Sequence, residues 1–237
     1  YPLRRQRQMC IRDSNKPLYA WDVSNVTNMT GMFNLSTSFN QNINSWDVSS
    51  VTQMNFMFYG ASVFNGPLNS WDISNVTNMI TMFSHASNFN QNINSWDVSN
   101  VTDMSGMFEQ AIAFNQPLSN WDVSNVTDMS GMFAYANSFN QAIDNWDVSK
   151  VTNMEKMFYK NSAFNQALNS WRFPKFSNKT RMFREATAFN QPLNNWNVDS
   201  TLTMLEMFWG ASAFDQNLGD WKIQSIFNMA GILGYSG

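Results

Sequence analysis

Residue types that most catalytic and metal sites require are nearly absent from this chain. Its 237 residues include one cysteine, Cys10, and one histidine, His85. The sequence also has no glycine-rich phosphate loop and no unique pair of acidic residues. The sequence therefore offers no set of residues for acid–base, nucleophilic or metal-assisted catalysis. We expect a non-enzymatic protein with no catalytic residues, no cofactor and no metal site.

Positive charge is scarce over most of the chain. Residues 15–149 contain one cation, Lys16, against ten acidic residues, whereas nine cations face six acidic residues from Lys150 onward. A nucleic-acid-binding surface needs a basic patch to neutralise phosphates, so nucleic acid is not an expected partner. The uneven charge predicts an electrically polar molecule, which could orient a partner along its surface.

The only basic run lies in residues 1–14 and does not fit the pattern of the rest of the chain. Arg4–Ser14 matches, residue for residue, the translation of a transposase adapter used in sequencing libraries. We interpret residues 1–14 as a translated adapter, which has to be set aside before the fold is considered. Residues 15–237 then contain no cysteine, ten basic residues and sixteen acidic residues. On this interpretation the native N-terminus is missing, and the end at Gly237 leaves a C-terminal truncation open.

Aromatic residues, by contrast, are abundant and recur at a fixed spacing. A tryptophan stands at every 25th position from Trp21 to Trp221, nine times without an insertion or a deletion. A fixed period of this size is the signature of repeat architectures, in which each unit stacks on its neighbours. Residues 15–237 are therefore predicted to form a single solenoid of about nine 25-residue repeats.

Phenylalanine and methionine are confined to columns of the repeat in the same way. Two phenylalanine columns run from Phe39 to Phe214 and from Phe33 to Phe208, and two methionine columns run from Met29 to Met229 and from Met32 to Met207. Lys179 is the one exception in the first methionine column. A residue type that recurs once per repeat indicates a packing requirement that every coil shares. These columns and the tryptophans are the predicted core.

The apolar spacing within one unit predicts a strand followed by a helical turn. Asn120–Ser124 alternates apolar and polar residues and, with Leu118, has the L-x-x-W-x-V spacing of a leucine-rich-repeat strand. The apolar residues between Val126 and Ala136 recur every three or four positions, which is the helical period. The predicted fold class is an α/β repeat, with one short parallel strand and one short helix or 3₁₀ turn in each 25-residue coil.

The repeat resembles those of the BspA-like leucine-rich-repeat surface proteins, in particular the Met- and Trp-rich branch known from mycoplasma surface lipoproteins. The resemblance rests on WDVSNVTNM at Trp21–Met29, on WDVSNVTDMSGMF at Trp96–Phe108 and Trp121–Phe133, and on FNQPL at Phe114 and Phe189. It implies a right-handed, leucine-rich-repeat-like solenoid. It also implies an extracellular or cell-surface location and a role in adhesion or protein interaction, without naming a ligand.

The aspartate that follows the tryptophan forms the main candidate binding face. It recurs in six consecutive repeats, as Asp22, Asp47, Asp72, Asp97, Asp122 and Asp147. If the coils stack about 4.8 Å apart, these carboxylates lie in a row that could recruit Ca²⁺ or a basic partner. The alternative, which we favour, is that each aspartate accepts backbone N–H bonds within an Asp-Val-Ser-Asn turn, because one carboxylate per coil is a poor calcium site.

Two further polar columns have structural explanations as well as functional ones. The Asn-Gln pairs from Asn40-Gln41 to Asn190-Gln191 favour a hydrogen-bonded ladder over a sugar site. The threonines from Thr27 to Thr152 raise an ice-binding face as a remote alternative, although ordered hydroxyls in a single column are weak support for it.

Taken with the resemblance, these patterns predict a recognition or adhesion module. We expect its polar strand face to bind a protein or glycan partner, and no segment of the chain to span a membrane. The main alternative is a structural stalk or spacer within a longer surface protein.

Overall fold

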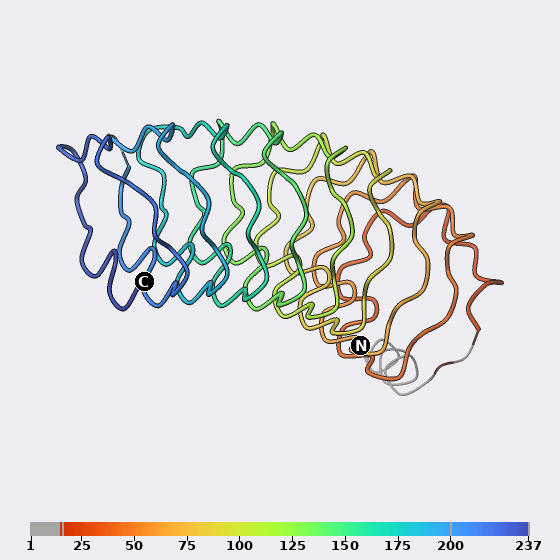
Figure 1. The fold of residues 1–237 in the computed structure, drawn as a ribbon. Helices are drawn as coiled ribbons and strands as arrows, with labels where there is room; N and C mark the ends of the chain where they lie inside the picture. Colours follow the sequence, from red (N-terminus) through yellow and green to blue (C-terminus); the bar gives the residue numbers. More distant parts are fainter. Residues whose placement is uncertain (1–14, 16, 200, 237) are drawn as a thin grey trace.

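The chain winds through successive 25-residue coils that stack side by side (Figure 1). The computed structural model describes residue 15, residues 17–199 and residues 201–236. The adapter interpretation of residues 1–14 lies outside these described residues. We number the coils 1 to 9 by their tryptophans, so that coil 5 is residues 114–138 and coil 7 is residues 164–188.

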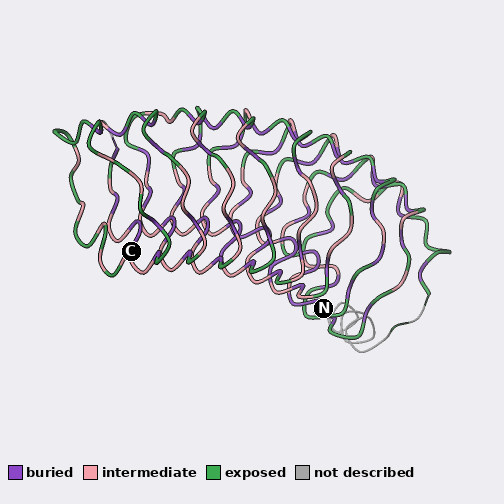
Figure 2. Ribbon diagram, in the orientation of Figure 1, coloured by how far each residue is buried: buried purple, intermediate pink, exposed green. Residues whose placement is uncertain are grey.

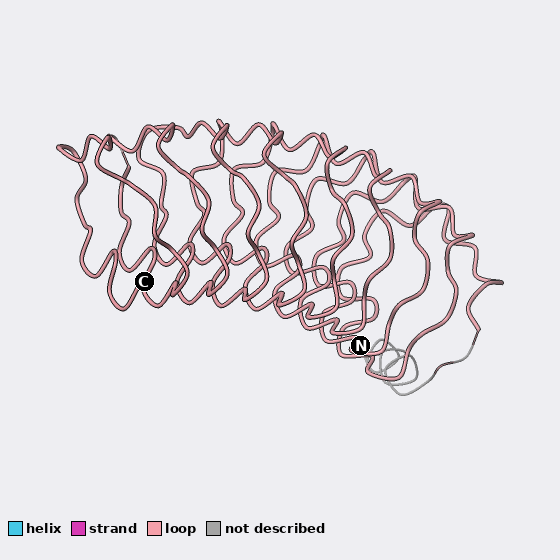
Figure 3. Cartoon of the chain, viewed as in Figure 1, coloured by secondary structure: helices cyan, strands magenta, loops and turns pink. Residues whose placement is uncertain are grey.

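The described residues contain no helix and no extended strand (Figure 3). Their regular backbone pairing consists of isolated parallel bridges that join the same position of consecutive coils, beginning with Asn28 and Gln53 and ending with Asn178 and Thr203. The predicted α/β fold, a leucine-rich-repeat-like solenoid with a strand and a helix or 3₁₀ turn in each coil, is therefore wrong. The coils stack, but turns and single bridges build them.

The predicted strand at Asn120–Ser124 fails because tight turns flank it. The Trp121 N–H donates to the Leu118 carbonyl at 3.2 Å, and the Val126 N–H donates to the Val123 carbonyl at 2.9 Å. These bonds close local turns and leave the segment without a ladder to the neighbouring coil. The bridge between coils lies instead at Asp128, inside the segment that was predicted to be helical.

The predicted helix fails because its backbone N–H groups alternate between two kinds of partner. In coil 5 the N–H groups of Gly131 and Tyr135 donate to carbonyls of coil 6, each at 2.8 Å. The N–H groups of Met132 and Ala136 donate to the carbonyl three residues earlier, at 3.2 and 3.1 Å. Consecutive turns of this kind place apolar residues three or four positions apart, as a helix does. The apolar spacing of Val126–Ala136 therefore does not distinguish the turns from a helix.

Both turns need a left-handed backbone at their third residue. Gly131 and Tyr135 have φ values of 63° and 57°, and the equivalent two positions have positive φ in all nine coils. A type II turn requires positive φ at this position, which is why glycine is preferred there. The glycines Gly31, Gly106, Gly131 and Gly231 meet this demand in the first of the two columns.

The predicted core columns are confirmed, since their tryptophan, phenylalanine and methionine residues are buried except in the end coils, where Trp21 is exposed and Met32 and Met229 are partly buried. Figure 2 shows buried segments in the successive coils. The second phenylalanine of each coil stacks on the first phenylalanine of the next coil, with ring centroids 3.8–4.2 Å apart. From Trp46 to Trp221, each indole N–H donates to the carbonyl 28 residues earlier, at 2.7–3.1 Å. A buried indole needs such a partner, and here the preceding coil supplies it.

The predicted asparagine ladder is also confirmed. The Asn40 side-chain oxygen accepts the backbone N–H of Asn65 at 2.8 Å, and the same bond recurs from coil to coil as far as Asn190 and Asp215. In most coils the following glutamine donates to the same oxygen. The column is thus part of the scaffold.

Coil 7 breaks the core pattern at Lys179, which is fully buried in a column of methionines. Its ammonium group donates to the hydroxyls of Ser177 and Thr201, and it lies 4.0 Å from the ring centroid of Phe173. Burial lowers the pKa of Lys179 to about 7. Within the described residues, no carboxylate forms an ion pair with it.

Candidate binding surfaces

The six aspartates of the predicted binding face all lie exposed on the outside of the stack. Each accepts the backbone N–H of the serine two residues later, at 3.0–3.1 Å. In the first three coils the serine hydroxyl donates to the same oxygen at 2.6–2.7 Å. These are the local Asx bonds of the structural alternative, so a structural role accounts for their conservation from coil to coil.

The same bonds favour the charged form of five of the six aspartates. Hydrogen bonds from the serine side chain and then the serine backbone lower the pKa of most of the row, namely Asp22, Asp47, Asp72, Asp122 and Asp147. We call the six aspartates the Asp row. No group of three or more histidine, cysteine or acidic side chains that could hold a metal ion occurs among the described residues. The role of the Asp row in binding a partner stays a prediction.

A second candidate surface was missed by the sequence analysis. It follows the two positive-φ columns and the column between them, and we call it the variable face. Its members in coils 4 to 8 are Gly106, Glu109, Gln110, Gly131, Ala134, Tyr135, Lys156, Tyr159, Lys160, Arg181, Arg184, Glu185, Glu206, Trp209 and Gly210. The signal that could have found it is the lack of a consensus in three columns flanked by fixed core columns.

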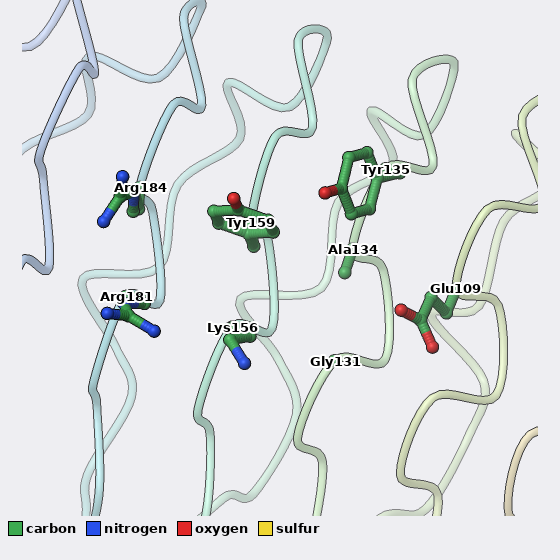
Figure 4. A pocket seen from close by; sticks show the side chains of 8 residues that line it. All are labelled: Glu109, Gly131, Ala134, Tyr135, Lys156, Tyr159, Arg181 and Arg184. Carbon is green, nitrogen blue, oxygen red and sulfur yellow. The ribbon is translucent and has the colours of Figure 1, made fainter.

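A groove of about 420 Å³ crosses the variable face of coils 4 to 7 (Figure 4). Gly131 and Ala134 leave space between the larger side chains that surround it. Three cations and one acid line it, together with two tyrosines. The lining residues are Glu109, Gly131, Ala134, Tyr135, Lys156, Tyr159, Arg181 and Arg184.

Ion pairs fix the cationic end of the groove. The Nε of Arg181 lies 2.8 Å from Oε2 of Glu206, and Arg184 pairs with the same oxygen. These bonds, with that from Arg181 the largest influence, lower the pKa of Glu206. Two guanidinium groups from adjacent turns thus already hold one carboxylate between them.

The tyrosines form the middle of the groove. Tyr135 and Tyr159 meet edge to face with ring centroids 5.2 Å apart, and the Lys160 ammonium lies 5.6 and 5.4 Å from the two centroids. Lys160 also pairs with Glu185 at 3.4 Å, and this carboxylate raises the pKa of Lys160. Burial, followed by the hydrogen bond with Tyr159, raises the pKa of Tyr135.

Much of the variable face is held in a conformation that L-residues resist. Among its members, Tyr135, Lys156, Lys160, Arg181 and Glu206 all have φ values between 52° and 58°. For a residue with a Cβ atom, this left-handed region costs about 1–2 kcal/mol. Glycine at the same columns in other coils avoids the penalty.

Comparison with known proteins identifies a family but no curated relative. Residues 6–116, 80–190 and 141–236 match the model of a family described as "Mycoplasma protein of unknown function, DUF285". The three matches overlap, as expected for tandem repeats. No curated protein matches the chain. No helix of the described residues is long and apolar enough to cross a membrane.

Proposed function

From the premise that the chain belongs to the DUF285 family of mycoplasma repeat proteins, we propose that it is a non-enzymatic recognition module. It acts outside the cell or at its surface, in the manner of the BspA-like proteins that its repeat resembles, and binds a protein or glycan partner. The observation that carries this proposal is the Asp row, six exposed carboxylates presented at the same position of consecutive coils.

The Asp row suits recognition of a cationic partner because its charge is preorganised. Serine hydrogen bonds fix the side chains before a partner arrives, so little conformational entropy is lost on binding. The lowered pKa values of five of the six side chains keep these carboxylates ionised well below neutral pH. A row of like charges attracts an extended basic partner and accelerates its encounter.

Neutralising three aspartates tests this proposal without disturbing the fold. Asparagine keeps the local bond, since Asn197 in the same column already accepts the Asp199 N–H at 3.2 Å. We expect the triple variant Asp72→Asn/Asp97→Asn/Asp122→Asn to bind an octa-lysine peptide at least tenfold more weakly at low salt. The same variant should retain less material in pull-downs from host or neighbouring cell surfaces and on glycan arrays.

A matched control removes three carboxylates outside the Asp row. Asp144→Asn, Asp215→Asn and Asp220→Asn change the net charge by the same amount. Asp144 and Asp215 occupy columns in which asparagine is the usual residue, so these changes are conservative. Equal weakening in both triple variants would show that net charge, and no particular face, governs binding, and would defeat the proposal.

A stalk or spacer is the second candidate function. It is favoured by the continuous aromatic core, in which phenylalanine rings stack between coils with centroids 5.3–5.8 Å apart from Phe33 to Phe208. Such a core makes a stiff connector. Recovery of the full open reading frame separates the two, because an anchor and many further repeats without partner binding would favour the stalk. The ice-binding alternative from the threonine column stays a prediction.

A further inference from the structure

The residues of the variable face change strongly from coil to coil. Neighbouring core columns repeat the same residue in nearly every coil, and the Asp row repeats in six. The first positive-φ column, by contrast, runs Gly, Phe, Thr, Gly, Gly, Lys, Arg, Glu and Gly. The three diverging columns form a continuous strip along the stack, next to fixed core columns.

Drift at unconstrained positions does not explain the two positive-φ columns of this strip, because those positions are constrained. Their backbone demands positive φ, and glycine meets that demand best. Without a functional requirement for another side chain, glycine should be retained at these positions or should replace other residues there. Large side chains such as Tyr135, Lys156 and Arg181 occupy these positions in the groove against the backbone preference, as Phe56 and Thr81 do outside it. Strained residues that persist in this way cluster at binding and switch regions.

The side chains on the strip are those that dominate protein–protein interfaces. Tyrosine, tryptophan and arginine carry most of the energy at such surfaces, and Tyr135, Tyr159, Arg181, Arg184 and Trp209 lie on it in consecutive coils. The rings contact one another and neighbouring cations, as in the 5.6 Å approach of Arg184 to Trp209. The anchors are thus half-buried and oriented in advance.

The charge of the groove specifies its ligand. Three cations and one acid line the groove, and Glu155, Glu185 and Glu206 beside it pair with those cations. Arg181 and Arg184 hold the carboxylate of Glu206 between them, and each guanidinium has five N–H donors for further acceptors. The Lys156–Glu155 pair, at 3.2 Å, is more than one-third exposed on both sides and so only weakly occupies Lys156.

We infer that the variable face of coils 4 to 8 is a docking surface for a protein partner. An acidic, extended segment of that partner lies in the groove with its carboxylates on Lys156, Arg181 and Arg184 and its apolar atoms on Tyr135 and Tyr159. This inference rests on the proposed function as a recognition module, but it places a second contact on a groove lined by cations, whereas the Asp row is anionic.

Restoring glycine tests the inference, because it separates binding from stability. In the variant Lys156→Gly/Arg181→Gly, two groove cations disappear and two strained residues relax. We expect at least tenfold weaker binding of a fluorescent octa-glutamate peptide at low salt, together with a melting temperature equal to or above that of the native protein. Weaker binding with an unchanged or higher melting temperature cannot come from damage to the fold.

Two matched variants complete the experiment. Phe56→Gly/Thr81→Gly makes the same backbone change in coils 2 and 3, away from the groove, and should leave peptide binding within twofold of native. Lys175→Gln/Lys222→Gln removes two cations outside the groove and should also leave it within twofold. Native-like binding by the groove variant, or equal weakening in either control, would overturn the inference.

The partner class is tested with the same variants. An oligogalacturonate presents carboxylates on a sugar backbone, and binding of this glycan in preference to the octa-glutamate peptide would overturn the assignment to a protein segment. Failure of the Asp row is distinguishable, because its asparagine variants are read with the octa-lysine peptide and leave every groove residue unchanged.

Discussion

Coil 5 and coil 7 are copies of the same 25-residue repeat, but the side chains buried in their cores differ. In coil 5 the core is apolar throughout, with Met129 and Phe133 fully buried. In coil 7 the residue equivalent to Met129 is Lys179, equally buried, and Ser177 is buried where coil 5 exposes Thr127. In coil 7 the buried ammonium group is accompanied by changes in neighbouring columns that supply it with hydroxyl partners.

The changes around Lys179 form one connected set. After Phe173 and Pro174, the turn of coil 7 lies one residue later than in coil 5, and Phe176 takes a φ of 61° and is 60% exposed. This turn points Ser177 inward. Thr201 of coil 8 replaces the usual valine and brings the second hydroxyl. A buried ammonium group without such partners would be far more costly.

The largest effect should come from restoring the consensus at Lys179. Burial depresses its pKa from 10.5 to about 7, so the unfolded chain binds the proton more tightly than the folded protein does. Native stability should therefore rise as the pH increases from about 7 to about 10.5. Lys179→Met should stabilise the protein by about 4–5 kcal/mol below pH 7, and this advantage should fade over the same pH interval.

Urea unfolding at pH 6 and pH 10 measures this difference. Titratable groups on the segments around Lys179 include Glu155, Lys175 and Asp199, so the comparison is made between the variant and the native protein at each pH, which cancels their contributions. A stability difference that does not change with pH would mean that Lys179 titrates normally and is not buried as a neutral amine.

The next effect contrasts phenylalanines of the two coils. Phe133 is fully buried and stacks on Phe139 with centroids 3.8 Å apart, whereas Phe176 points outward. Phe133→Ala should cost about 3–5 kcal/mol, as large-to-small core substitutions do, and Phe176→Ala should cost less than about 0.5 kcal/mol. Similar losses in the two variants, measured by urea unfolding, would contradict the outward position of Phe176.

The smallest effect compares hydroxyls in one column. The Ser177 hydroxyl accepts a hydrogen bond from Lys179, while the exposed Thr127 hydroxyl donates to the Thr102 carbonyl at 3.2 Å. Ser177→Ala should cost about 1–3 kcal/mol because it removes a partner of a buried polar group. Thr127→Ala should cost less than about 0.5 kcal/mol. Thermal melting of the two variants checks the order.

The repeat and its core were predictable because packing demands return with the period. Trp121, Phe133 and Met129 recur in fixed columns, and they are buried as expected. The strand and the helix were not predictable, because consecutive turns place apolar residues three or four positions apart just as a helix does. The sequence signal for these turns was the glycine column, and Lys156 and Arg181 obscured it by replacing glycine at positive φ.

Of the two candidate surfaces, one could be predicted from the sequence and the other could not. The Asp row was found because it repeats, and the structure explains that repetition by local bonds to serine. The variable face was missed because a search for recurring residues passes over positions that differ. Only the backbone reveals that Tyr135, Lys156 and Arg181 occupy equivalent and demanding positions.

The bond from each indole N–H to a carbonyl 28 residues earlier has a consequence for how such a chain can evolve. Together with the asparagine ladder, whose bonds join residues 25 positions apart, it favours coils that all have the same number of residues. An insertion of a single residue would keep both contacts only if the extra residue bulged out at an exposed turn. Duplication or deletion of whole units, 75 nucleotides for each 25-residue coil, changes the length of the chain and preserves both contacts.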